Sequence, residues 1–396
     1  MLHSKADVRV PRRKRVFLIP THQVRLPSGS KILSFIKKNA VLLIAFLAAV
    51  TTTFFVPIDA AYIDYFDFKT LTCLFSVLAV VCALRNIRFF YLMAYKIVRA
   101  FKNAKIAVLA LVYITFIGSM LIANDMALLT FLPLGYFVLS TTGKEKYMAF
   151  TFIMQNIAAN LGGMLTPFGN PQNLYLYSKF NIPTGEFMSI MALPFVLSVA
   201  LITAVCLIFV KAEKLEIKEE TIHLPKGRCF VYLLLFALSI VIVFRVIPYV
   251  LGLIAIVIAL LFMDRKALKN VDYGLLLTFV FFFIFSGNMS RIEGVRTVLS
   301  QLLAQNTLLF STLSCQIISN VPSAILLSQF TDQYAELLIG VNLGGFGSLI
   351  SSLASLITFG QYTKYNPGKG KYYIALFTLI NFLFLAILLS VMSLLT

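Results

Sequence analysis

Charged side chains are rare in this chain of 396 residues: 13% are Asp, Glu, Lys or Arg, while 60% are hydrophobic. Soluble domains average about 25% charged and about 45–50% apolar residues. Too little polar side chain is present to cover a water-facing globule of this size. The composition excludes an ordinary soluble enzyme, a disordered chain and a secreted disulfide scaffold. It predicts an all-α polytopic protein embedded in a lipid bilayer.

Histidine and paired cysteine are scarce as well. The 3 histidines lie in polar segments, and the 5 cysteines show no CxxC or CxxH spacing. We interpret the cysteines as small core residues and not as a metal site or a disulfide framework. No histidine, cysteine pair or carboxylate pair falls within an apolar segment, so the sequence predicts neither an enzyme nor a bound cofactor.

Acidic residues are outnumbered, with 16 Asp and Glu against 34 Lys and Arg, and a basic arm at residues 1–38 opens the chain. In a soluble protein this excess would suggest nucleic acid, but membrane proteins accumulate basic residues in cytoplasmic loops. Suppose that the N-terminus is cytoplasmic and that the over-long apolar segments 106–140 and 306–330 are re-entrant hairpins. Then 29 of the 34 basic residues fall inside. This asymmetry predicts a multi-pass protein of the inner membrane, with no nucleic-acid partner.

The same landmarks occur twice along the chain. Each set has an aspartate before an apolar run (Asp67, Asp272), an amphipathic stretch, a polar-centred hairpin, and a helix that opens with Asn-Leu-Gly-Gly and then breaks. By the topology above, the first set starts outside and the second inside. We therefore predict two inverted repeats, an architecture typical of secondary transporters. The predicted parts are a first repeat at 39–210 with its broken helix at 147–177, a cytoplasmic linker at 211–228, and a second repeat at 229–396 with its broken helix at 335–363.

Polar interruptions in the first repeat are candidate binding sites. Asp125, which follows Asn124, is the only carboxylate well inside an apolar segment, where a charge is costly unless it is paired, ion-bound or wetted. It is a candidate ligand for Na⁺ or H⁺; the alternative is a simple turn, for which Asn and Asp are also suited. Residues 166–173, with two prolines, cannot continue a helix. Their oxygens suit a hard cation and their amides an anion, unless the stretch is a loop at the membrane edge.

The second repeat offers weaker counterparts. Its hairpin centre contains Ser319 and Asn320, and its broken helix has a serine-rich stretch at 347–355 without prolines or asparagines. Small residues of this kind also serve close helix packing. The sequence leaves binding and packing open for this stretch.

At these residues the chain resembles the ion-transporter superfamily, which includes divalent-anion/sodium symporters, citrate transporters, arsenical-pump membrane proteins and one class of sodium/proton antiporters. Its symporters carry Ser-Asn-Thr at each hairpin tip, matched here by Ala-Asn-Asp at 123–125 and Ser-Asn-Val at 319–321. Its helix break, Gly-(Ser/Thr)-Pro-x-Asn, is similar to residues 169–173. The second break lacks the Pro and Asn of this signature, which puts a second cation site in doubt.

Residues and resemblance together predict two overlapping sets of ligands. The expected cation ligands are Asn124, Asp125, Thr166, Gly169 and Asn170. The expected substrate contacts are Asn124, Asn173, Ser319, Asn320, Ser323, Ser352 and Ser355.

We therefore expect a permease that moves a small anion or oxyanion, coupled to Na⁺ or H⁺, by alternating access. The resemblance further implies a homodimer in which the hairpins move past a fixed scaffold. Three alternatives stay open: a Na⁺/H⁺ antiporter that uses Asp125 as its titrating group, a membrane-embedded enzyme, and a channel. Anion-independent Na⁺/H⁺ exchange would favour the first of these.

Overall fold

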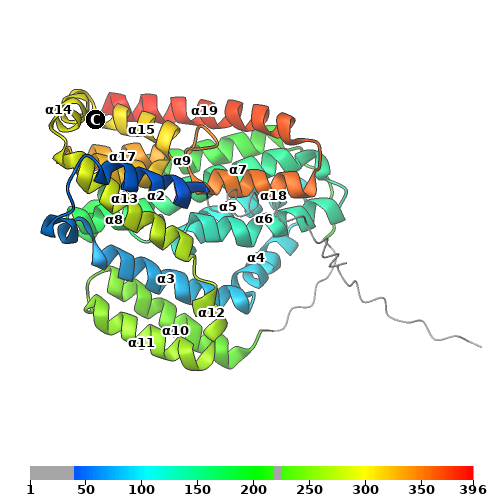
Figure 1. Ribbon diagram of the computed structural model, residues 1–396. Coiled ribbons are helices and arrows are strands. Elements are labelled where there is room, and N and C mark those ends of the chain that lie inside the picture. Colours follow the sequence, from blue (N-terminus) through cyan, green and yellow to red (C-terminus); the bar gives the residue numbers. More distant parts are fainter. Residues whose placement is uncertain (1–39, 218–223, 396) are drawn as a thin grey trace, which may run out of the picture. The chain divides into compact units, whose positions relative to one another are not determined.

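The computed structural model describes residues 40–217 and 224–395, and its regular elements there are helices, apart from one isolated β-bridge (Figure 1). The predicted basic arm at 1–38 and residues 218–223 of the predicted linker lie outside the described residues. Six of the described helices are long and apolar enough to cross a membrane. The prediction of an all-α polytopic membrane protein is confirmed. The six helices are Phe68–Asn86, Ala104–Ile122, Thr184–Phe209, Lys226–Val243, Tyr273–Arg291 and Gly370–Leu395.

The elements follow one another in two comparable series. The first comprises α2 (Ala40–Thr53), η1 (Ala60–Tyr65), α3 (Phe68–Asn86), α4 (Phe89–Arg99), α5 (Ala104–Ile122), α6 (Asn124–Thr141), η2 (Glu145–Tyr147), α7 (Met148–Gly162), η3 (Gly163–Leu165), α8 (Pro171–Lys179) and α9 (Thr184–Phe209). The second comprises α10 (Lys226–Val243), α11 (Tyr249–Met263), α12 (Arg265–Lys269), α13 (Tyr273–Arg291), α14 (Glu293–Gln305), α15 (Thr307–Ile318), α16 (Asn320–Leu327), α17 (Tyr334–Leu343), α18 (Leu353–Tyr365) and α19 (Gly370–Leu395).

Matching caps start the corresponding helices of the two series. The side chain of Asp67 accepts a hydrogen bond from a backbone N–H three residues on at the start of α3, and Asp272 does the same for α13. Such caps satisfy donors that a helix end otherwise leaves free. The two helices run antiparallel, because the last turns of α3 contact the chain before α13 (Cys82 to Asn270), while Gly287 near the end of α13 lies against Tyr65 before α3.

Both polar-centred segments fold back on themselves. In the first, Gly118 of α5 packs against Phe131 of α6, although thirteen residues of chain separate them. In the second, the hydroxyls of Ser314 on α15 and Ser323 on α16 lie 2.9 Å apart. Each hairpin then packs against the helix that follows it, α7 on α5 and α17 on α15.

The helices after the hairpins are interrupted. The chain between α7 and α8 forms one short 3₁₀ turn and then extended backbone around Thr166 and Asn170, where Pro171 starts α8. Proline is well suited to this first helical position because its missing N–H would be unbonded there. The chain between α17 and α18 is likewise irregular, and the side chain of Ser352 caps α18. The two breaks bring backbone carbonyls and amides into the buried interior.

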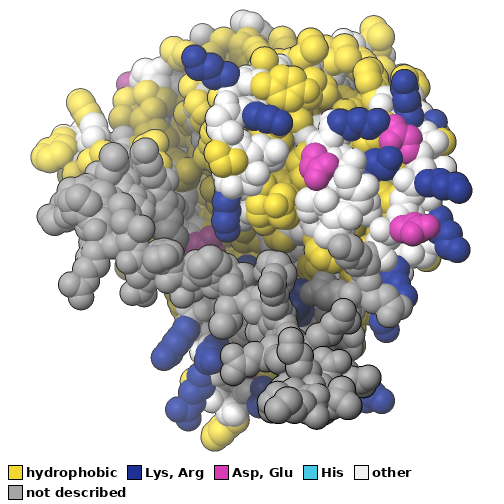
Figure 2. All heavy atoms as spheres, turned by 90° about the vertical axis from the view of Figure 1, so that its right-hand side faces the viewer, with side chains coloured by type: hydrophobic (Ala, Val, Ile, Leu, Met, Phe, Trp, Pro, Cys, Tyr) yellow, Lys and Arg dark blue, Asp and Glu magenta, His cyan; other side chains and the backbone are white. Residues whose placement is uncertain are grey.

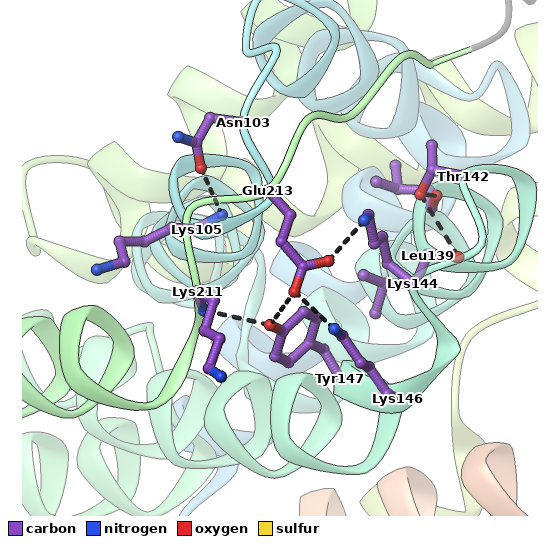
Figure 3. Close-up of polar contacts among 10 residues, drawn as sticks. Asn103, Lys105, Leu139, Thr142, Lys144, Lys146, Tyr147, Lys211 and Glu213 are labelled. Atoms are coloured by element: carbon purple, nitrogen blue, oxygen red, sulfur yellow. Dashed lines mark hydrogen bonds and ion pairs between the residues drawn. The ribbon is translucent and has the colours of Figure 1, made fainter.

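Basic side chains gather on one face of the molecule, where Lys and Arg outnumber Asp and Glu (Figure 2). At the chain segments after α6 and α9, one carboxylate holds several of these groups together (Figure 3). Glu213 accepts from Lys144 and Lys146, each at 2.6 Å, and from the hydroxyl of Tyr147 at 2.9 Å. Its backbone carbonyl accepts from the N–H of Ala104 at 2.8 Å. The start of the predicted linker is therefore fixed to the first turn of α5.

Glu213 should contribute a pH-dependent part of the stability. Lys144, then Lys146 and Tyr147, lower the pKa of this carboxyl from 4.5 to about 2. A group whose pKa is lowered by folding stabilises the folded chain above its unfolded pKa, and this stabilisation is lost as pH falls through the folded pKa. We expect Glu213→Gln to melt at a lower temperature than the unmodified protein at neutral pH. The difference should shrink from about pH 4.5 toward pH 2.

Thermal melting of the two purified proteins in detergent across this pH range measures the effect. Glu145→Gln is the matched control, because Glu145 is an exposed carboxylate next to Lys144 and Lys146. A melting difference between Glu213→Gln and the unmodified protein that stayed constant down to the acid limit would contradict the assigned role.

Candidate functional site

The two hairpin tips meet at one buried point. Asn124, the first residue of α6, donates to Oδ1 of Asn160 on α7 at 3.3 Å. A Cβ atom on Gly345, which follows α17, would lie 2.9 Å from Nδ2 of Asn320 and 3.4 Å from the same Oδ1 of Asn160. Asn124 therefore bonds Asn160, and Asn320 lies close to it. A side chain at residue 345 would come between Asn320 and Asn160.

Both tips have an unusual backbone conformation. Ala123 has φ 68° and ψ 153°, and Ser319 has φ 77° and ψ 158°. Almost only glycine adopts this region, and a residue with a side chain pays of order 1–3 kcal/mol to occupy it. The conformation aims the N-termini of α6 and α16 at the meeting point. Strain of this kind persists where the surrounding structure requires it, which favours a functional role for the tips.

An amide network fills the first break. Nδ2 of Asn173 lies 3.1–3.4 Å from three carbonyl oxygens of the break. Nδ2 of Asn170 bonds the carbonyl of Asn160 and the side chain of Asn342, each at 3.2 Å. Asn342 belongs to α17 of the second series, and its own Nδ2 donates to Asn173 Oδ1 at 2.6 Å. One residue of the second half thus completes the break of the first half.

Three side-chain oxygens of the first tip and the first break are buried without a partner among the described residues. They are Oδ1 of Asp125, Oδ1 of Asn170 and Oε1 of Gln172. The Asn170 oxygen lies against Gly163 and close to the backbone at Gly169. Buried acceptors are nearly always bonded, and a hard cation such as Na⁺ takes carboxylate, amide and carbonyl oxygens as ligands, so these unpartnered oxygens suit such an ion. The hydroxyl of Thr166 donates to the carbonyl of Met120 at 2.9 Å, which leaves the lone pairs of its oxygen for a cation.

The second break is closed by a side chain from its own hairpin. Nε2 of Gln316 on α15 donates to the carbonyl of Gly344 at 2.9 Å, and its Oε1 accepts from the N–H of Ser348 at 2.8 Å. Gly347, with φ 134°, has no side chain that would collide with this amide. Gln316 precedes its tip asparagine by four residues, as Met120 does in the first hairpin. The amide of Gln316 therefore bonds backbone groups of the second break that would otherwise be open to a ligand.

The serines singled out from the sequence lie in different surroundings. Ser319 is at the tip beside Asn320, and Ser323 is bonded within its hairpin to Ser314. Ser352 and Ser355 bond each other at 3.1 Å, and Ser355 accepts from Asn156 of α7 at 3.3 Å. The structure thus connects this pair to the network through α7. The hydroxyl of Ser323 points into its own hairpin pair.

Several residues of the network were not expected as ligands from the sequence. They are Asn156, Asn160, Gln172, Gln316 and Asn342. Asn160 and Asn342 open the same four-residue motif in each half, and each donates to the carbonyl four residues before it, at 3.0 and 2.8 Å. The repeated asparagine was the signal that could have revealed them. Nothing in the sequence marks Gln316.

The arrangement combines two kinds of binding group. The N-termini of α6 and α16 carry the positive ends of helix dipoles and suit an anion. The unpartnered oxygens of Asp125 and Asn170 suit a cation. In the described chain no cluster of three His, Cys, Asp or Glu side chains could hold a transition metal. The geometry is that of a buried site for small ions, formed jointly by both halves.

Comparison with known proteins agrees with this assignment. A family model described as citrate transporter matches residues 31–360, so the chain belongs to the citrate transporter family. It is 34% identical over 295 residues to a protein of Methanocaldococcus jannaschii named as an uncharacterized transporter, covering 74% of this chain and 80% of that protein. It is 26% identical over 324 residues to the inner membrane protein YbiR of Escherichia coli, covering 78% and 84%. The chain is therefore a multi-pass membrane transporter.

Proposed function

We propose that the protein is a secondary active transporter for a small anion or oxyanion, driven by Na⁺ or H⁺. The observation that carries the proposal is the convergence of Asn124 and Asn320 on Asn160. Two helix N-termini face this point, and the first tip and the first break contain unpartnered oxygens of Asp125, Asn170 and Gln172. A site that offers both kinds of group can take an anion and a cation together, which is the requirement for coupled symport. The family's name adds carboxylate anions, citrate among them, to the substrates to be tested.

The transport cycle follows from the symmetry of this site. The antiparallel course of α3 and α13 and the matching element order support two inverted repeats, with a cytoplasmic N-terminus in the inner membrane. The hairpins would then reach the centre from opposite faces. Movement of both hairpins and of α7, α8, α17 and α18 against the remaining helices would open the site to each side in turn. A homodimer with fixed scaffold helices at its interface fits this mechanism.

Uptake into proteoliposomes tests the proposal. The purified full chain is reconstituted and given radiolabelled citrate, sulfate or phosphate with an inward Na⁺ gradient, a pH gradient, or neither. We expect one gradient to accelerate uptake of at least one anion, and Asn124→Ala to abolish the acceleration. Absence of gradient-dependent uptake for all three anions, in liposomes that show intact protein, would refute the anion proposal.

One observation favours a second candidate, a Na⁺/H⁺ antiporter. Asp125 is the carboxylate at the first tip, and its Oδ1 has no partner in the described chain. A carboxyl group in this position could bind Na⁺ and H⁺ in alternation. The same liposomes distinguish the two functions, because an antiporter would exchange Na⁺ for H⁺ without any anion other than chloride. A pH-sensitive dye trapped inside reports this exchange.

A further inference from the structure

A surface cavity lies beside the first hairpin, lined by residues other than those of the two tips. Its volume is about 240 Å³, and it is enclosed by the end of α3, the start of α4 and the middle of α6. Arg85 and Arg88 contribute its positive charge, and Tyr91 and Thr130 add polar surface. Leu129 and Pro133 form an apolar wall, and no acidic residue lines it.

Arg85 is the residue that gives the cavity its chemistry. Its Nη1 lies 3.2 Å from the thioether sulfur of Met126, which is only a weak acceptor. A guanidinium group offers five N–H donors in a rigid fork. Within residues 40–217 and 224–395 no carboxylate lies within ion-pair distance of Arg85. A half-buried guanidinium with this surplus of donors is suited to bind an oxyanion, and planar carboxylate, phosphate and sulfate groups match its geometry.

The second arginine reinforces the field of the cavity. The guanidinium carbon of Arg88 stands 4.4 Å from the ring centre of Tyr91, which keeps it beside the cavity. The hydroxyl of Thr130 donates to the carbonyl of Met126 at 2.8 Å, so its two lone pairs are left as acceptors for a ligand that carries a hydroxyl or an acid proton. The two charged residues that line the pocket in the described chain are both basic, which favours an anion over a cation.

The cavity lies between the first tip and the basic face. Leu129 and Pro133 follow Asn124 by five and nine residues of α6, which corresponds to about 7–14 Å along the helix axis. Beyond the end of α6 lie Lys144 and Glu213. The cavity also separates α3 from a hairpin helix, where a fixed part would meet a moving one. Arg85, in contact with Met126 two residues after Asn124, therefore lies beside the part of α6 that runs from the first tip toward Lys144.

We propose that this cavity is an oxyanion-binding site on the path of the transported anion, with Arg85 receiving one carboxylate, phosphate or sulfate group. The inference rests on the proposed function and names the residue that selects its substrate class. Arg85 holds the anion as it approaches or leaves the first tip. It adds a positive charge that attracts the anion, whereas the asparagines of the tips are uncharged. The phosphate of a lipid headgroup shares this chemistry, and the experiment separates the two sources.

The experiment measures anion binding by thermal melting of the purified full chain in detergent. Citrate, sulfate and phosphate are titrated at constant Na⁺ and constant ionic strength, since a ligand that binds the folded state raises its melting temperature. The variants are Arg85→Gln, Arg85→Lys and the matched control Lys96→Gln, which removes an exposed charge from α4. We expect Arg85→Gln to weaken binding of the best probe about 10- to 100-fold, in line with the loss of a charged hydrogen bond. Arg85→Lys should fall between, and Lys96→Gln should bind as the unmodified protein does.

The competing source is tested in nanodiscs of phosphatidylcholine with and without phosphatidylglycerol. If Arg85→Gln loses only a retained phosphatidylglycerol, detected by native mass spectrometry, and binds the free anions normally, the proposal is wrong. It is also wrong if no probe raises the melting temperature of the unmodified protein.

Uptake kinetics distinguish failure of this inference from failure of the proposed function. If Arg85→Gln leaves KM unchanged while coupled uptake still requires Asn124, Arg85 does not bind the transported anion, and the proposed transport function is unaffected. If the unmodified protein moves no anion, the proposed function itself is wrong.

Discussion

Replacing Asp125 with asparagine is expected to reduce cation-coupled uptake about 10- to 100-fold without unfolding the protein. The change keeps the shape of the tip and removes the charge of a side chain whose Oδ1 has no partner among described residues. Loss of one charged interaction with a bound ion corresponds to about 1.5–3 kcal/mol. The backbone N–H of residue 125 would still donate to Asn124 Oδ1, which accepts it at 2.9 Å.

The measurement compares initial uptake rates with and without the driving cation gradient, and checks folding by melting temperature. Asp332→Asn is the control, because Asp332 is an exposed carboxylate that lies after the end of α16. Coupled uptake by Asp125→Asn at the rate of the unmodified protein would refute the role of Asp125 in cation binding. A melting temperature equal to or above that of the unmodified protein is expected, since an uncompensated buried charge is removed.

Replacing Asn342 with alanine is expected to give the largest loss of stability. Asn342 accepts from Asn170 and Gln172 and donates to Asn173, so its removal leaves these three amides short of partners. Each buried polar group left unsatisfied costs about 1–3 kcal/mol, and we expect a total of about 2–5 kcal/mol because the costs are not additive. The first break should loosen and bind its cation more weakly.

A matched control exists on α19. Asn381 is buried like Asn342, and its Nδ2 donates to the carbonyl four residues before it at the same 2.8 Å. Its Oδ1 has no partner in the described chain, so Asn381→Ala removes no bridge between elements. Thermal melting should show a clear loss for Asn342→Ala and little for Asn381→Ala. Equal losses would mean that the network around Asn342 contributes nothing specific.

Much of this architecture could be predicted from the sequence because membrane helices leave strong signals. Long apolar runs and the aspartates before α3 and α13 mark the spans and their starts. The polar centres around Asn124 and Asn320 mark the turns of the hairpins. Pro171 marks the first break, because proline is favoured at the first position of a helix. The proposed membrane orientation and the division into repeats stay predictions.

The contacts that individual side chains make in the folded protein could not be predicted from the sequence. The shared motif places Asn160 and Asn342 on corresponding helices. It does not indicate that the side chain of Asn342 reaches the break of the other half. Ala123 and Ser319 are not glycines, so nothing in the letters indicates their backbone conformation. Gln316 looks like an ordinary polar residue near a helix end, and only the folded chain brings it to Ser348. These contacts depend on tertiary packing, which no local pattern encodes.

The bridge from Asn342 to the first break also bears on how the molecule can be divided. Neither half contains all the partners of its own interrupted helix, so neither is a self-sufficient unit. A gene cut between the codons for residues 217 and 224 should give two fragments that are inert when made separately. Working protein should return only when both fragments are synthesised in the same cell and pair within the bilayer.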